Sequence, residues 1–214
     1  MTDRGARTEL AGELVLASGN RGKLAEFEQL FQALPVVLRR QDEFDVVPAE
    51  ETASTFIENA LLKARAAAAQ TGRPALADDS GLAVDALGGA PGIRSARFAA
   101  DAGASGAAED RDAANRRHLL AVMRDVDPDK RGAAFHCALV LLLHAEDPVP
   151  MIVEGRWRGT ILEKERGTGG FGYDPLFFVP DLNKSAAELD PGLKNRISHR
   201  GLATKALLAR LTAR

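Results

Sequence analysis

Short apolar runs alternate with segments of helical periodicity along the first half of the chain. Residues 14–17 form a buried-strand pattern, and apolar side chains then recur at helical spacing as far as Pro35, after which a second strand pattern begins. A further helix is predicted over residues 55–70, with Gly72 as its stop signal. Strand, helix and strand in this order are typical of an α/β protein.

The pattern continues with strands and fewer helices. A strand over 75–77 is expected to deliver Asp78-Asp79-Ser80-Gly81 at its end, where Gly81 permits a turn, and a second strand-like run follows through 82–87. The remaining predicted elements are a helix near 108–126, paired strands over 133–144 and 151–157, a strand over 176–179, and a helix over 198–211.

The domain organisation follows from this pattern. Residues 1–12 lack periodicity and are expected to form a flexible extension. Residues 13–214 are predicted to form one α/β domain, either a single compact body or a body of two lobes separated by a cleft.

Composition narrows the class of protein. The 28 basic and 30 acidic residues give a formal net charge of −2, so the chain has no overall basic field for a nucleic-acid backbone, and a polyanion must be bound locally. No apolar run approaches the length of a membrane span, and no secretory signal pattern begins the chain. Cys137, the single cysteine, lies in an apolar run and fits a core residue in a reducing compartment. We therefore expect a cytoplasmic protein without membrane or nucleic-acid partners.

The turn after the first strand has the features of a phosphate site. Its glycines allow tight bending, the peptide N–H groups at the start of the following helix can face an anion, and a lysine adds positive charge. The residues are Ser18, Gly19, Asn20, Arg21, Gly22 and Lys23. An ordinary strand-to-helix turn with a solvated lysine is the alternative.

Adjacent carboxylates follow the strand over 75–77. Open α/β sheets place ligands at the carboxyl ends of strands, and carboxylate oxygens suit Mg²⁺. Strand alternation directs Asp78 and Asp79 to opposite faces, so only one of them needs to reach a ligand, and we favour Asp79. Glu50 and Glu51 precede the second helix and either can serve as another metal ligand, or they can simply favour the helix N-terminus.

Two polar positions on the second helix remain open. Asn59 and Lys63 lie on one face of this alanine-rich helix, and a solvated polar face explains them as well as a ligand role does.

Candidate base-binding residues lie in the last quarter of the chain. Phe171 and Tyr173 stand in a glycine-rich loop, where an aromatic ring can stack on a nucleobase or fold back on the core. Asp174 can accept from a ring N–H group. His199 and Arg200 begin the last helix, and their donors suit a carbonyl oxygen or phosphate, although incidental charges at a capped helix start are the alternative.

Five sequence blocks in order closely resemble the inosine triphosphate pyrophosphatase family, also called non-canonical purine nucleoside triphosphate pyrophosphatases. The resemblance covers nearly the whole chain and rests on ASGNRGKLAEF, EETASTFIENALLKA, ADDSGLAVDALGGAPGIRSARFA, GTGGFGYDPLFFVP and KNRISHRG. It implies an elongated, two-lobed α/β body with a mixed central sheet flanked by helices, an active-site cleft between the lobes, and assembly as a homodimer.

The resemblance also implies roles for individual residues. Asp79 matches the catalytic and metal-binding aspartate, and the second Mg²⁺ ligand falls on Glu51 or its neighbour Glu50, of which we choose Glu51. The implied substrate-binding residues are Ser18, Gly19, Asn20, Arg21, Gly22, Lys23, Ser80, Phe171, Gly172, Tyr173, Asp174, Lys194, His199 and Arg200.

The expected reaction is hydrolysis of ITP, dITP and XTP to the monophosphate and pyrophosphate, with Asp79 or a metal-bound water as the base. Donors on His199 or Arg200 would favour a 6-oxo purine over adenine. Two alternatives stay open: a pyrophosphatase for another modified nucleotide, and a nucleotide-binding module without catalysis.

Overall fold

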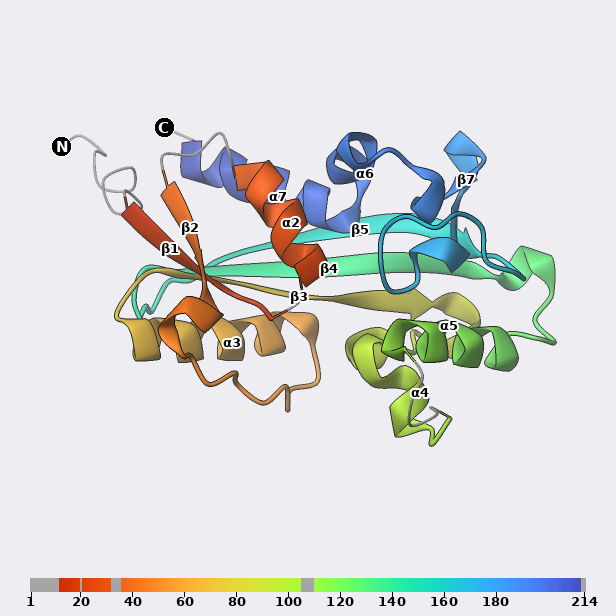
Figure 1. Cartoon of the computed structure of the whole chain (residues 1–214), viewed down its shortest axis with the longest axis horizontal. Coiled ribbons are helices and arrows are strands. Elements are labelled where there is room, and N and C mark those ends of the chain that lie inside the picture. Colours follow the sequence, from red (N-terminus) through yellow and green to blue (C-terminus); the bar gives the residue numbers. More distant parts are fainter. Residues whose placement is uncertain (1–11, 20, 32–35, 105–109, 213–214) are drawn as a thin grey trace. The chain divides into compact units, whose positions relative to one another are not determined.

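The computed structural model in Figure 1 describes residues 12–19, 21–31, 36–104 and 110–212. The strands are β1 (Gly12–Ala17), β2 (Val36–Arg40), β3 (Ala75–Val84), β4 (Gly132–Leu142), β5 (Met151–Ile161), β6 (Phe177–Val179) and β7 (Lys184–Ser185). The helices are α2 (Arg21–Phe31), α3 (Phe56–Thr71), α4 (Phe98–Asp101), α5 (Arg111–Val122), α6 (Pro191–Ile197) and α7 (His199–Thr212).

The strands form a seven-stranded sheet in the order β2-β1-β3-β4-β5-β6-β7. β1 pairs in parallel with both β2 and β3, whereas β6 pairs in antiparallel fashion with both β5 and β7. The sheet is therefore mixed and flanked by helices, which confirms the predicted α/β class.

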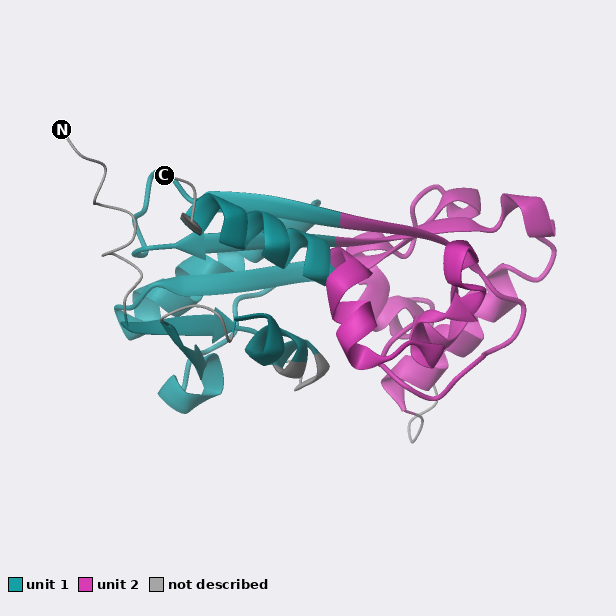
Figure 2. Cartoon of the chain, turned by 90° about the horizontal axis from the view of Figure 1, so that it is seen from above, with its two compact units in different colours: residues 1–79, 137–155, 200–214 teal, residues 80–136, 156–199 magenta. Residues whose placement is uncertain are grey.

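The chain folds into two compact units (Figure 2). The first unit contains residues 1–79, 137–155 and 200–214, and the second contains 80–136 and 156–199. The elongated shape and the cleft between lobes stay predictions.

The first unit has a core on each face of its strands. Helices α2 and α7 cover one face, and α3 covers the other (Figure 1). Strand alternation divides the side chains between the two cores: Leu14, Leu16 and Leu76 face α2 and α7, while Val15 and Ala77 belong to the core that contains α3. By the same alternation, Asp78 lies on the face of Leu76, and Asp79 lies on the face of Ala77.

The second unit has a core of its own. It gathers apolar side chains from α5 and from β3, β4, β5 and β6, including Leu82, Met123, Phe135, Trp157 and Phe177.

Most helix ends follow the predicted signals. Thr55 caps α3, its hydroxyl accepting from the N–H of Glu58 at 3.2 Å, and Gly72 ends it with φ at +63°. Helix α7 lies within one residue of its predicted bounds. Helix α6, which Asp190 caps, was not predicted as a separate element.

Several boundaries differ from the prediction. Helix α5 ends at Val122 rather than near 126, and residues 85–87 of the predicted second strand-like run form a 3-10 helix. Residues 78–81 lie inside the continuous strand β3 instead of forming a turn, because partner side chains on both faces accommodate the charges of Asp78 and Asp79. Helix α2 already begins at Arg21, so the predicted turn is shorter. Strand β5 extends past Trp157 to Ile161, since buried and exposed positions keep alternating along it.

The predicted N-terminal extension lies, up to residue 11, outside the described residues, and β1 begins at Gly12. In the described ranges, every helix falls short of the length and apolar character needed to cross a membrane.

Candidate functional site

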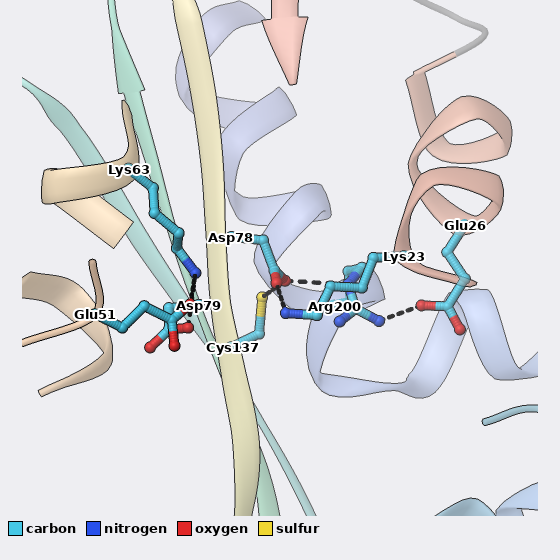
Figure 3. A network of polar contacts seen from close by, with 8 residues as sticks. All are labelled: Lys23, Glu26, Glu51, Lys63, Asp78, Asp79, Cys137 and Arg200. Carbon is cyan, nitrogen blue, oxygen red and sulfur yellow. Dashed lines mark hydrogen bonds and ion pairs between the residues drawn. The ribbon is translucent and has the colours of Figure 1, made fainter. Parts of the chain in front are cut away.

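Strand β3 carries two polar clusters of the first unit, one on each face. Figure 3 shows Asp78 pointing to one side of the strand and Asp79 to the other. This is the alternation predicted for adjacent strand residues. β1 pairs with β3 as far as Ala17 and Ala77, so Ser18 begins the phosphate turn beside Asp78.

Asp78 lies at the centre of a buried ionic cluster. Its Oδ1 accepts from the ammonium of Lys23, and its Oδ2 accepts from Arg200 Nε at 3.1 Å and from the Cys137 thiol at 3.2 Å. Arg200 also donates to Glu26 of helix α2, and its side chain is 1% exposed. Two residues of the predicted substrate site, Lys23 and Arg200, thus meet at one carboxylate that sequence reasoning left without a role.

The cluster keeps its charges fixed. Burial raises the pKa of the Asp78 carboxyl, but the cations of Arg200 and Lys23 outweigh it and hold that pKa far below its usual range. Burial lowers the pKa of Arg200, and Asp78 and Glu26 more than reverse the effect. Burial and the Asp78 charge raise the pKa of the Cys137 thiol, which therefore stays protonated. Cys137 is a core residue, as predicted.

Asp79 forms the second cluster with two residues of flanking segments. Lys63 of α3 donates to Asp79 Oδ1 at 2.8 Å and to Glu51 Oε1 at 3.0 Å, so one ammonium bridges both predicted metal ligands. Asn59, one turn earlier on α3, accepts from the N–H of Ala53 at 3.0 Å and anchors the segment that carries Glu51. Lys63 and Asn59 share a face, as predicted, and on that face Lys63 contacts the carboxylates of Asp79 and Glu51.

The pKa of Asp79 is shifted in the opposite direction from that of Asp78. Burial raises the pKa of the Asp79 carboxyl, although Lys63 beside it acts in the opposite direction. Burial lowers the pKa of Lys63, but the carboxylates of Asp79 and Glu51 raise it overall. Lys63 therefore stays charged, while Asp79 is a stronger base than an ordinary aspartate.

The donor set on this face fits a magnesium ion. Asp79 Oδ2 is buried and has no hydrogen-bond partner among the described residues, so it offers an unused lone pair beside Glu51. Across the described ranges, no group of three or more His, Cys, Asp or Glu side chains is arranged to hold a metal. Two carboxylates agree with Mg²⁺, which commonly takes one or two from the protein and its other ligands from water and phosphate.

The phosphate turn is only partly described. Ser18 and Gly19 follow β1, Asn20 lies outside the described residues, and Arg21 and Gly22 form the start of α2, where backbone N–H groups lack helical partners. The contact of the Lys23 ammonium with Asp78 ties this turn to strand β3.

The predicted base-binding loop belongs to the second unit and is held by charges. Asp174 Oδ2 accepts from Lys194 Nζ at 2.7 Å and from the N–H of Phe171 at 2.9 Å. Lys194 Nζ also lies 4.9 Å from the centroid of the Phe171 ring. The structure therefore brings three of the predicted residues together, namely the half-buried Phe171, Asp174 and Lys194.

The other predicted residues of the second unit lie in different surroundings. Tyr173 is 4% exposed and its hydroxyl donates to the Ser95 carbonyl at 2.8 Å, so this ring packs in the core, which is the alternative left open for it. His199 stacks on Phe135 with ring centroids 4.8 Å apart. Ser80 follows Asp79 in β3.

Known proteins match this chain over residues of both units. The Ham1 family profile matches residues 14–210. The chain belongs to the Ham1 family. It is 54% identical to a dITP/XTP pyrophosphatase of Pectobacterium atrosepticum over 196 residues, which are 92% of this chain and 96% of that protein. It is 50% identical to a dITP/XTP pyrophosphatase of Thioalkalivibrio sulfidiphilus over 94% of this chain and 100% of that protein.

A solved Ham1 structure shares the fold. The HAM1 protein of Coxiella burnetii superposes with a TM-score of 0.84 at 48% identity, covering 94% of this chain and 99% of that one. The resemblance stated from the five sequence blocks is thus confirmed, and so is the α/β architecture of a Ham1 protein.

Sequence reasoning missed Glu26 and left the role of Lys63 open. Glu26 follows Lys23 by three positions and so shares its face of α2, which could have indicated a common partner. For Lys63 a ligand role and a solvated face were both possible, and helical spacing alone could not show that it reaches Asp79.

Proposed function

We propose that the chain hydrolyses purine nucleoside triphosphates with non-standard bases, namely dITP, XTP and ITP, to the monophosphate and pyrophosphate. Curated relatives at about half identity carry the name dITP/XTP pyrophosphatase and match nearly the whole chain. The observation that carries the chemistry is the Asp79 carboxylate, which has one oxygen bonded to Lys63 and the other buried with no hydrogen-bond partner among the described residues.

Asp79 and Glu51 are the residues that would hold Mg²⁺. Bound there, the ion would offset the negative charge of the phosphate oxygens and of the leaving pyrophosphate. Glu51 is preferred over Glu50 because its carboxylate shares the Lys63 ammonium with Asp79.

Asp79 is proposed to take a proton from the attacking water. The water oxygen forms a bond to the α-phosphorus, the bond between that phosphorus and the bridging oxygen breaks, and pyrophosphate leaves with the bonding electrons. In the metal-free protein, burial raises the pKa of the Asp79 carboxyl. Lys63 keeps Asp79 oriented through its 2.8 Å bond and supplies a fixed positive charge.

The phosphate turn is proposed to bind the triphosphate. Ser18 to Lys23 lead into the N-terminus of α2, whose backbone N–H groups and partial positive charge favour anions. The Lys23 ammonium has three donors, so it can bind a phosphate oxygen while it stays bonded to Asp78.

The base-binding loop of the second unit is proposed to select the base. Phe171 offers a ring for stacking, and Asp174 and Lys194 hold it in place. Gly172 is proposed as a further substrate contact of this loop. Ser80 and His199 are further proposed substrate contacts. Arg200 is buried and already bonded to Asp78 and Glu26, so it is proposed to support the triphosphate site through Asp78, which also binds Lys23. Tyr173 is proposed to support this loop from the core rather than to stack.

Assembly and location are also proposals. By the resemblance to its family, the chain is proposed to act as a homodimer in the cytoplasm, with no nucleic-acid or membrane partner.

A substrate panel in isotopically labelled water tests the proposed reaction. We expect the purified protein with MgCl₂ to convert ITP, dITP and XTP to monophosphate and pyrophosphate, with ATP and modified pyrimidine triphosphates turned over far more slowly. In H₂¹⁸O, attack at the α-phosphorus places the label in the monophosphate. Release of orthophosphate, label in pyrophosphate, or equal rates with ATP would contradict the proposal.

A further inference from the structure

Helix α5 holds the backbone of Gly172 on both sides of its Cα, through the N–H group and through the carbonyl. Asp112 Oδ2 accepts a hydrogen bond from the N–H of Gly172 at 2.8 Å. Arg116 Nη1 donates to the carbonyl of the same Gly172 at 3.1 Å. Asp112 and Arg116 stand four residues apart and therefore share one face of α5.

Arg116 connects a second point of the loop to the same helix. Its Nε donates to Glu165 Oε1 at 2.9 Å, and its side chain is 17% exposed. Glu165 precedes Gly172 by seven residues, so a single guanidinium holds two separate points of the segment 165–172. The planar, rigid donors of arginine suit this double contact better than a lysine ammonium does.

These contacts matter because the loop has little rigidity of its own. It contains four glycines between residues 167 and 172, three of them with positive φ, including Gly172 at +59°. Glycine backbones have more accessible conformations than other residues, so the conformation of the loop depends on contacts from outside it. Phe171 directly precedes Gly172, the residue whose backbone α5 holds.

Phe171 itself is held by the contacts already described. Asp174 accepts from the Phe171 N–H group, and Lys194 lies against the ring. The ring is therefore confined by α5 through Gly172 and by α6 through Lys194.

We infer that Asp112 and Arg116 are positioning residues for purine selection, which act by fixing the backbone of Gly172 and with it the ring of Phe171. This inference rests on the proposed function, because it takes Phe171 as the residue on which the base stacks.

The test separates base binding from phosphate binding. Arg116→Gln and Asp112→Asn are compared with the wild type and with Arg124→Gln, which removes an exposed arginine beyond the end of α5. For each protein one measures KM and kcat for ITP, the inhibition constant of tripolyphosphate, which lacks a base, and the unfolding midpoint.

We expect Arg116→Gln and Asp112→Asn, the two loop-contact variants, each to raise KM for ITP by about tenfold, which corresponds to about 1.4 kcal/mol. Their kcat and the tripolyphosphate constant should stay within about twofold of wild type, since a weakened base contact acts on substrate binding. Arg116→Lys should give an intermediate KM. The double variant should raise KM by less than the product of the single effects, because both side chains hold the backbone of the same residue, Gly172.

Two outcomes would overturn the inference. Wild-type KM in both loop-contact variants overturns it, and so does an equal rise of KM and of the tripolyphosphate constant together with a lower midpoint, which indicates a general structural role. If Arg116→Gln does not fold, Asp112→Asn carries the same test. A wild type that binds ITP without hydrolysing it contradicts the proposed function alone, and the dissociation constant of ITP then replaces KM.

Discussion

Replacing Asp78 by asparagine is expected to destabilise the protein strongly while keeping the shape of the side chain. Asp78 is fully buried between Lys23 and Arg200, and Arg200 is itself 1% exposed. Removing one partner of a buried ion pair commonly costs about 3 to 5 kcal/mol, because the remaining charge is left uncompensated. For a chain of this size, that cost lowers the unfolding midpoint by roughly 6 to 20 °C.

The pH dependence of this effect has a definite sign. The pKa of Asp78 in the folded protein lies below its ordinary value of 3.8, so its stabilising contribution is present above that pH and is lost as the pH falls below it. The difference between wild type and Asp78→Asn should therefore be complete at pH 7 and shrink between about pH 4 and pH 2.

Thermal unfolding followed by circular dichroism in EDTA measures this difference without a contribution from metal. Asp42→Asn is the matched control, since Asp42 pairs with Arg40 at the surface and exposed ion pairs contribute little to stability. An Asp78→Asn midpoint within about 2 °C of wild type at pH 7, or a difference that grows in acid, would show that the ion pairs of Asp78 do not stabilise the fold.

Three further predictions concern the candidate site. Lys63→Met should lower kcat/KM by about 10²-fold or more, as steady-state kinetics can measure, because it removes the fixed charge beside Asp79 and Glu51; an unchanged value would contradict this role. Phe171→Leu should raise KM for ITP by about 5- to 150-fold, the value of one stacked base, whereas Tyr173→Phe should leave KM unchanged and destabilise the fold by about 1 kcal/mol in chemical denaturation; the reverse pattern would exchange their roles. Chelation with EDTA should abolish turnover and added MgCl₂ should restore it, and turnover that persists in EDTA would contradict a metal requirement.

The sequence predicted the parts of the fold that depend on local pattern. Apolar periodicity placed β1, α2 and α3, and the signals of Thr55 and Gly72 marked the ends of α3 within a residue. Strand alternation also separated Asp78 from Asp79. The prediction of a turn at residues 78–81 was wrong. Two aspartates before a serine and a glycine are typical of a turn, but cations from distant elements allow these residues to continue β3.

The candidate site shows the same division between local and distant information. Motif resemblance selected Asp79 and Glu51, but no spacing indicated that Lys63 bridges their carboxylates. Arg200 was selected for its donors, and only the structure revealed that Asp78 and Glu26 already engage it. Partners more than a hundred residues apart in sequence are set by packing, which a single sequence does not contain.

Turnover of ITP by Asp79→Asn, measured beside the wild type in MgCl₂ with pyrophosphate release as the readout, is the sharpest test of the proposed chemistry. We expect that the variant still binds ITP but releases pyrophosphate at least about 10³-fold more slowly, because asparagine cannot accept the proton of the attacking water. An Asp79→Asn protein with wild-type turnover would show that Asp79 is not the catalytic base.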